Sequence, residues 1–186
     1  MSSDVDLEQL QRDVRYLKDR LDIQDCIMRY ARGVDRHDAE LMESAYHEGA
    51  QARYGSNVIP KAEHANWSNS AHAERFSLHA HHITNMTCEI DGDVAHCESY
   101  TIGVFLSSDQ KRTSFVSARY VDRLERRDGE WRIVQRRAMT DIAIEGDASF
   151  IGAFRGRPVD KTEFWTHADL SYQRPIDLSV PSPAWH

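Results

Sequence analysis

The chain of 186 residues has the length of one domain, or of one domain with an additional arm. Hydrophobic residues make up 40% of it and charged residues 28%, which is typical of a globular protein and excludes a disordered one. The net charge of −7 argues against nucleic-acid binding, because no basic stripe offsets it. No stretch approaches the roughly 18 apolar residues that cross a bilayer, so we expect no membrane partner.

The N-terminal sequence and the cysteines predict a cytoplasmic protein. The start, MSSDVDLEQ, is acidic and lacks the hydrophobic core of a secretory signal. Cys26, Cys88 and Cys97 are odd in number and show no C-x-x-C spacing. Cys88 and Cys97 flank a predicted hairpin turn, and the register decides whether they lie opposite each other. We favour three reduced thiols.

Residues 7–21 are predicted to form a helix that packs along a narrow seam. The seam residues, at spacings of three and four, are Leu7, Leu10, Val14, Leu17 and Leu21. Two heptads are too few for an autonomous coiled coil. We therefore expect this helix to pack on the domain or on a neighbouring subunit.

Three further helices and one extended segment are predicted before residue 77. A second helix covers about 22–34, and a third opens at about residue 38 and continues to 48. The stretch 49–55 is expected to be extended. The stretch 60–76 is expected to be helical, with Pro60 in its first turn, where the missing N–H does no harm.

Long alternating strands follow, which predicts an α+β fold. The expected strands are 79–90, 94–106, 113–126 and 131–144, and they form a four-strand antiparallel run. A sheet strongly curved around the leading helices would make a cone with an inner pocket. In the second strand, one face combines Val94, Tyr100, Ile102 and Val104.

The chain is thus divided into a domain at 1–145 and a C-terminal arm at 146–186. The arm contains four of the five prolines, so it is expected to be irregular. It also contains too many aromatic residues for a disordered linker. We expect it to pack on its own or on a neighbouring subunit.

Histidines are concentrated between residues 72 and 82. Strand alternation places His79 and His81 on one face and His82 on the other. One strand supplies only two metal ligands and no metal-binding spacing is present, so we expect no metal. Histidines that face solvent or cap a sheet edge are one alternative. The favoured interpretation makes His81 a general base in the pocket.

Asp35 follows Val34 at the inner edge of an apolar helix face. A buried carboxylate without a partner is costly, so a partner is expected. His81 is that partner if the first long strand crosses the end of the second helix, and Asp35 then fixes the histidine tautomer. Alternatively, Gly33 and Asp35 simply end the helix, with the carboxylate capping the next one.

Three segments in this order resemble a known family: 22-DIQDCIMRYARGVDRHDAELM-42, 81-HHITN-85 and 120-YVDRLERRDGEWRI-133. They are similar to the SnoaL-like branch of the nuclear transport factor 2-like superfamily, to the group of lindane dehydrochlorinase, scytalone dehydratase and bile-acid 7α-dehydratase. The resemblance covers residues 5–145. It implies a cone-shaped fold, a homotrimer and an Asp–His dyad that falls on Asp35 and His81. It also implies polar pocket residues at Tyr30 and Tyr54.

One feature of that group is absent here. Its arginine on the last strand, eight or nine residues after the tryptophan, is replaced by Met139 and Thr140. Arg136 and Arg137 are nearby but would need a shift of face or register. The substrate anchor or the leaving group is therefore expected to differ.

Together these features predict a cofactor-free lyase that acts on a small hydrophobic substrate, such as a steroid or a polycyclic enone. His81 removes a proton activated by a carbonyl, Asp35 orients the ring, and Tyr30 or Tyr54 stabilises the enolate while water departs. No phosphate loop, dinucleotide fingerprint or nucleophile elbow is present, so no cofactor is expected. The candidate substrate-binding residues are Tyr54, Trp67, Phe76, Tyr100, Phe105 and Met139.

Two alternatives remain open. The same dyad could support isomerisation, cyclisation or dehydrohalogenation. The chain could instead be a non-catalytic ligand-binding or assembly module, such as the small subunit of a ring-hydroxylating dioxygenase. A buried, hydrogen-bonded pair of Asp35 and His81 discriminates between enzyme and module, because a module has no use for it.

Overall fold

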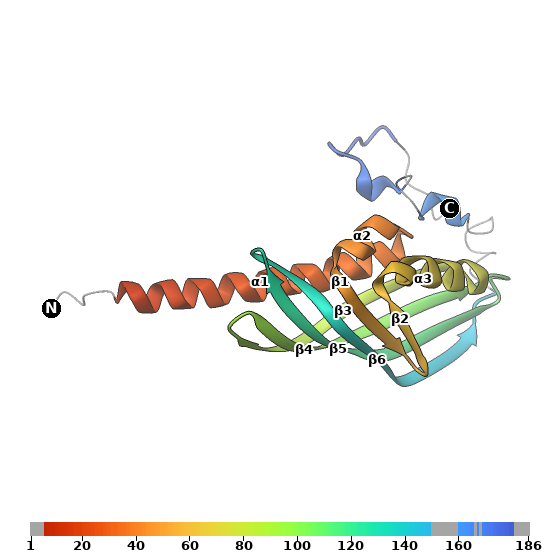
Figure 1. Cartoon of the computed structure of the whole chain (residues 1–186). Helices are drawn as coiled ribbons and strands as arrows, with labels where there is room; N and C mark the ends of the chain where they lie inside the picture. The colour runs from red at the N-terminus through yellow and green to blue at the C-terminus, as the bar shows by residue number, and fades with distance from the viewer. Residues whose placement is uncertain (1–5, 150–159, 166, 168, 181–186) are drawn as a thin grey trace.

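Helices precede a sheet of long strands in the computed structural model, which describes residues 6–149, 160–165, 167 and 169–180 (Figure 1). The helices are α1 (Leu7–Asp35), α2 (Ala39–Ser44) and α3 (Lys61–Arg75), followed near the C-terminus by the 3-10 turns η1 (Lys161–Glu163) and η2 (Leu170–Tyr172). The strands are β1 (Tyr46–Tyr54), β2 (Asn57–Pro60), β3 (Phe76–Asp91), β4 (Val94–Ser107), β5 (Arg112–Arg127) and β6 (Glu130–Asp147). The predicted α+β class is confirmed.

The sheet has six strands in the order β2-β1-β6-β5-β4-β3. β3 to β6 form the predicted antiparallel run, and β1 lies parallel to β6 and antiparallel to β2. α1 and α3 lie over one face of this curved sheet (Figure 1). The core between helices and sheet includes Ile23, Ile27, Tyr46, Leu124 and Ile133, each at most 1% exposed.

The first two predicted helices are one continuous helix, α1, because no glycine or proline interrupts the chain between them. Asp6 caps its start by accepting the N–H groups of Glu8 and Gln9, both at 3.1 Å. The early part of α1 projects away from the sheet (Figure 1). Its stripe, Leu7 to Leu21, is at least 48% exposed at each of the five positions. The sequence left two arrangements open, packing on the domain or on a neighbouring subunit. The exposure of the stripe excludes packing on its own domain.

Two other boundaries differ from the sequence prediction. The third helix ends at Ser44 rather than residue 48, because Tyr46 is 1% exposed and pairs with Ile133 at the start of β1. Burial in the sheet outweighs the helical pattern there. Pro60 is the N-cap residue of α3 and lies just outside the helix, not in its first turn.

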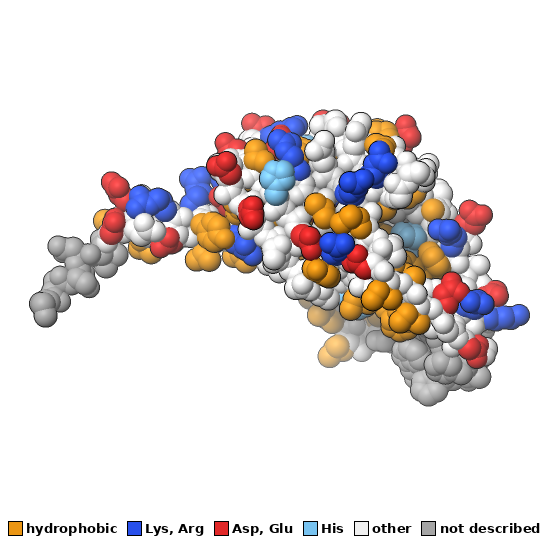
Figure 2. All heavy atoms as spheres, turned by 90° about the horizontal axis from the view of Figure 1, so that it is seen from below, with side chains coloured by type: hydrophobic (Ala, Val, Ile, Leu, Met, Phe, Trp, Pro, Cys, Tyr) orange, Lys and Arg blue, Asp and Glu red, His pale blue; other side chains and the backbone are white. Residues whose placement is uncertain are grey.

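β4 directs its more apolar face away from the helices. Tyr100 is 38% exposed and Ile102 is 41% exposed. Leu106 is buried near the end of the strand, and its other buried positions are small or polar residues: Ala95, Cys97, Ser99, Thr101 and Gly103. Figure 2 shows hydrophobic side chains in patches on the underside of the molecule and along the projecting part of α1.

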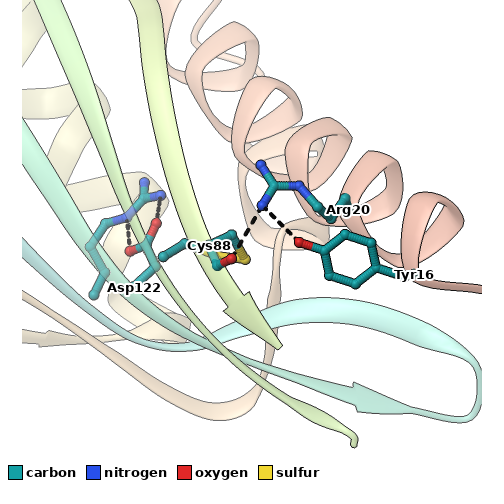
Figure 3. Close-up of a disulfide and its surroundings, with 6 residues drawn as sticks. Tyr16, Arg20, Cys88 and Asp122 are labelled. Carbon is teal, nitrogen blue, oxygen red and sulfur yellow. Dashed lines mark hydrogen bonds and ion pairs between the residues drawn. A yellow bond between two sulfur atoms is a disulfide. The ribbon is translucent and has the colours of Figure 1, made fainter. Parts of the chain in front are cut away.

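Cys88 and Cys97 face each other across β3 and β4 and form a disulfide, with their Cα atoms 4.1 Å apart. The expectation of three reduced thiols is therefore wrong for this pair, and Cys26 is the free, buried cysteine. Arg20 of α1 donates to the carbonyl oxygen of Cys88 at 3.2 Å, which fastens the helix to the sheet beside the disulfide (Figure 3).

The described part of the C-terminal arm contacts the end of α1 and the start of α2. Tyr172 donates to the Asp38 carboxylate at 2.7 Å, and Arg32 donates to the Ser171 carbonyl at 3.3 Å. Residues 150–159 and 181–186 of the arm lie outside the described residues. None of the described helices is both long and apolar enough to cross a membrane.

Candidate active site

Asp35 and His81 are joined by two hydrogen bonds. Asp35 is the last residue of α1, and β3 crosses the end of this helix so that His81 faces it. Oδ1 of Asp35 lies 2.6 Å from Nδ1 of His81, and Oδ2 accepts the backbone N–H of His81 at 2.8 Å. Their side chains are 13% and 10% exposed. This contact fixes the ring in one orientation and leaves Nε2 of His81 as the atom available to a substrate.

Two more histidines extend this pair on the side away from the cavity. Nδ1 of His79 lies 3.4 Å from Oδ1 of Asp35, and Nε2 of His79 lies 3.1 Å from Nε2 of His37. The His79 side chain is fully buried. His37 has a left-handed backbone with φ of 52° and stacks on Trp165 at 3.7 Å. Trp165, in the described part of the arm, therefore covers the site on the side of His37 and His79, away from the cavity.

The protonation states result from burial and hydrogen bonding. Burial opposes ionisation of Asp35, but hydrogen bonds from His79 and His81 outweigh it and lower the pKa of Asp35 to about 2. Burial lowers the pKa of His79, and it lowers the pKa of His72 to about 3 together with repulsion from His79 and His81. Asp35 is thus a carboxylate at neutral pH, and His72 and His79 are uncharged.

A cavity of about 610 Å³ opens beside the pair, between α3 and the inner face of the sheet. Six of the residues proposed from the sequence line it: Tyr30, Tyr54, Trp67, Phe76, His81 and Phe105. Asp35 belongs to the site through its partner His81. His72, from the histidine concentration noted in the sequence, also lines it, together with residues that the sequence did not single out, such as Arg75, Val116, Tyr120 and Glu145. Most of the lining surface is apolar, but polar side chains are interspersed in it, among them Ser68, Arg75, Thr101, Ser114, Thr140 and Glu145.

Tyr100 and Met139 do not line this cavity, which corrects two of the proposed substrate-binding positions. Both pair with Arg119, from opposite sides, on the outer face of the sheet. Alternation along the strands turns Thr101 and Ala138 inward in their place. The hydrophobic pattern suggested the wrong face because the outer face of β4 is the more apolar one.

Tyr30 and Tyr54 meet at one end of the cavity. Their hydroxyl oxygens are 2.6 Å apart, and Nε2 of His64 lies 3.1 Å from the Tyr54 hydroxyl. Burial raises the pKa of both tyrosines, so both keep their protons at neutral pH. A pair of protonated hydroxyls at a cavity wall can donate a hydrogen bond to a substrate oxygen.

Arg136 lies behind the tyrosines rather than in the cavity lining. Its guanidinium is 4.2 Å from the centre of the Tyr30 ring and 4.1 Å from that of Tyr120. It pairs with Asp122 through bonds of 2.7 and 2.6 Å, and both side chains are fully buried. The arginine lining the cavity is Arg75, from α3.

Asp35, His79 and His81 could also supply ligands to a metal ion, since their ligand atoms lie within 4.8 Å of one another. Sequence reasoning counted only two ligands because the third comes from α1. Ligands about 2.1 Å from a tetrahedral metal lie about 3.4 Å apart. The 2.6 Å between Asp35 and His81 is shorter and suits a direct hydrogen bond.

Comparison with known proteins agrees with this architecture. The model of the SnoaL-like domain matches residues 15–137. A type 2 hexachlorocyclohexane dehydrochlorinase (LinA) superposes with a TM-score of 0.67 at 19% identity, covering 72% of this chain and 93% of its own. A proposed scytalone dehydratase from Novosphingobium aromaticivorans has a TM-score of 0.64 at 15% identity, covering 72% and 90%.

A proposed aromatic ring hydroxylase from the same organism is also similar, with a TM-score of 0.62 and 26% identity over 70% of this chain and 94% of that one. No curated protein matches the sequence. The structural matches confirm the predicted fold.

Proposed function

The chain belongs to the SnoaL-like domain family, within the nuclear transport factor 2-like superfamily, and on that premise we propose that it is a cofactor-free lyase. Its reaction would be the elimination of water from a hydrophobic substrate that carries a carbonyl group. The hydrogen-bonded pair of Asp35 and His81 beside an apolar cavity is the observation that carries this proposal.

In the first step, Nε2 of neutral His81 takes a proton from a carbon next to the carbonyl, or vinylogous to it. The electron pair of the broken C–H bond moves into the carbonyl system and forms an enolate. Asp35 holds the Nδ1 proton and offsets the charge of the new imidazolium. A positioned base of this kind contributes about 10²–10⁴-fold.

In the second step, the enolate electrons form the new double bond and the carbon–oxygen bond to the leaving hydroxyl breaks. The proton on His81 passes to the departing oxygen, so water is released and the base is regenerated. Between the steps, the tyrosine pair donates to the enolate oxygen. Removing one such donor from an oxyanion site costs about 10²–10³-fold in rate in other enzymes.

The cavity favours a flat, apolar substrate with one polar end. Trp67, Phe76 and Phe105 supply aromatic walls, and Phe76 and Phe105 pack with ring centres 4.7 Å apart. A carbonyl would point to the tyrosines, and the acidic C–H to His81. A steroid or a polycyclic enone meets these requirements.

Isomerisation, cyclisation and dehydrohalogenation use the same first step and differ in the fate of the enolate. The similarity to LinA supports dehydrohalogenation as the nearest alternative. A non-catalytic module is disfavoured by the dyad, since a largely buried carboxylate hydrogen-bonded to His79 and His81 would have no role in it.

The test is a spectrophotometric dehydration assay on a panel of hydroxylated enones, including 7-hydroxy-3-oxo-4-ene steroids. Elimination extends the conjugation and adds absorbance at longer wavelength. We expect wild type to turn over at least one substrate. The turnover rate of His81→Ala should be lower by about 10²-fold or more. His82→Ala, on the exposed outer face of β3, is the matched control. Turnover that survives in His81→Ala would contradict the mechanism.

We further propose a homotrimer, as the resemblance of the sequence implies. Two exposed apolar surfaces support self-association: the α1 stripe, and an outer sheet face that carries Ile102, Phe115, Ile142 and Ile144, each at least 41% exposed. Apolar surfaces of this kind on a globular protein usually mark an interface.

A further inference from the structure

The tyrosine pair belongs to a chain of three hydrogen-bonding groups whose third member is His64. The Tyr30 and Tyr54 oxygens are 2.6 Å apart, and Nε2 of His64 is 3.1 Å from the Tyr54 oxygen. His64 comes from α3, is 2% exposed and does not line the cavity. It can therefore influence a substrate through the tyrosines, and its hydrogen bond is to Tyr54.

The number of protons decides whether this chain can serve a substrate. If Nε2 of His64 accepts, Tyr54 must donate to it and Tyr30 must donate to Tyr54. Both hydroxyl protons are then used inside the chain. If Nε2 of His64 carries a proton and donates, two internal bonds use the imidazole proton and one hydroxyl proton. The second hydroxyl proton is then free for an oxygen in the cavity.

We propose that His64 is a positioning residue whose Nε2–H donates to Tyr54 and so leaves one tyrosine hydroxyl to donate to the substrate carbonyl. This inference rests on the proposed function, which assigns the tyrosine pair to the enolate oxygen. It adds the group that sets the direction of the hydrogen bonds.

The surroundings of His64 hold its ring in the required place. Tyr30 stacks on it with ring centres 5.7 Å apart and planes at 18°, and Tyr46 meets it edge-on at 5.2 Å. Burial and the nearby Arg136 lower the pKa of His64 to about 4. The ring is thus neutral at pH 7 and has a single N–H, so the choice of nitrogen matters.

Charge that develops on the substrate oxygen strengthens this arrangement. Each donor in a hydrogen-bonded chain polarises the next, so His64 would act on the enolate through both hydroxyls. The Arg136 guanidinium over the Tyr30 ring, paired with Asp122, places the positive end of an ion pair behind the donor. An anion at the end of the chain therefore selects the donating tautomer of His64.

The probe is 2-naphthol, because its neutral and ionised forms have distinct absorption and fluorescence spectra and it needs no turnover. We expect wild type to bind the naphtholate in preference to the naphthol, which lowers the pKa of the bound probe. His64→Leu should lower the naphtholate affinity by about 10-fold and change the naphthol affinity by less than about 3-fold. His64→Gln, whose side-chain amide can donate, should recover most of the loss.

Three results would overturn the inference, and they separate it from the proposed function. Equal naphtholate binding by wild type and His64→Leu would remove His64 from the chain while keeping the tyrosine site. Equal losses in His64→Leu and His64→Gln, with both folded by circular dichroism, would make His64 a packing residue. If wild type shows no preference for the naphtholate, the tyrosine pair is not an oxyanion site, and the proposed function loses its enolate-stabilising step as well.

Nitrogen-15 NMR gives an independent readout that a purely structural role would not move. In the naphtholate complex, the ring nitrogens of His64, assigned by their disappearance in His64→Gln, should show the proton on Nε2. A proton on Nδ1, with Nε2 bare, would contradict the proposal.

Discussion

The carboxylate of Asp35 holds both the ring and the backbone of His81. Oδ1 lies 2.6 Å from Nδ1, and Oδ2 accepts the backbone N–H of the same residue at 2.8 Å. Both contacts require an acceptor, so an amide in place of the carboxylate must present its NH₂ group to one donor. These two hydrogen bonds make Asp35 more than a charge near the base, and they explain why the last residue of a helix can be a largely buried carboxylate.

The buried pair of Arg136 and Asp122 should be important for stability. Both side chains are fully buried, so Arg136→Met leaves the Asp122 charge without a partner. We expect a loss of about 3–5 kcal/mol in the free energy of unfolding, measured by urea denaturation. Arg119→Met, which breaks the exposed contact with Asp141, is the control and should have a much smaller effect. Equal effects of the two changes would contradict the account.

Stability should fall as the pH drops from about 6.5 to about 3. Burial holds the pKa of His72 at about 3 in the folded chain, whereas an unfolded histidine has a pKa of about 6.5. Between these values only the unfolded state binds the proton, so acid favours unfolding. His72→Gln should reduce the slope of the unfolding free energy by up to about 1.4 kcal/mol per pH unit. Urea denaturation at pH 7 and pH 5 measures it.

The matched control for that experiment is His82→Gln, on the exposed outer face of β3. A slope for His72→Gln that equals the wild-type slope would show that His72 is not buried in its neutral form. Asp35 acts in the same direction at lower pH. Its pKa of about 2 lies below the unfolded value of about 3.9, so its contribution is present above pH 4 and is lost as the pH falls toward 2.

Thiol titration tests the disulfide. Protein unfolded without a reductant should show one reactive thiol per chain, from Cys26, since Cys88 and Cys97 are joined. After reduction the count should be three. Three thiols without reduction would contradict the disulfide and would agree with the three reduced thiols expected from the sequence.

Removal of the α1 stripe should weaken self-association. Leu10→Glu with Leu17→Glu places two charges on a surface that is 48% and 60% exposed at these positions. We expect the molar mass in light scattering to fall from that of a trimer toward that of a monomer. Arg12→Gln with Arg15→Gln changes the net charge by the same amount on another face of α1. If both double variants keep the wild-type mass, the stripe is not an interface.

Local periodicity was sufficient to predict much of the site. Helix spacing placed Tyr30 on the inner face and Asp35 at the edge of it, and strand alternation placed His81 on one face of β3. The face on which each of these residues lies follows from the periodicity of its own helix or strand. Only the crossing of β3 over the end of α1 had to be added, and the family resemblance supported it. The predicted pocket helix likewise brings Trp67 to the cavity.

The features that sequence reasoning missed depend on packing between distant elements. His64 and His37 meet their partners across 10 and 42 residues, and no short motif signals either contact. The pairing of Cys88 with Cys97 depends on a register that the turn residues left open. Tyr100 and Met139 were misplaced because the outer sheet face is more apolar than the cavity face, so hydrophobicity alone pointed outward.

Deuterium exchange tests the central claim, that His81 with Asp35 removes a proton activated by a carbonyl, most directly. The substrate is 2-tetralone, a bicyclic ketone with acidic C–H bonds and no leaving group, incubated in D₂O and followed by proton NMR. We predict that wild type accelerates exchange and that Asp35→Asn and His81→Ala each lose about 10²-fold or more, while Asp25→Asn, exposed on α1, does not. Exchange with wild type that is no faster than in buffer would contradict the account. Exchange with both dyad variants that is as fast as with wild type would contradict it too.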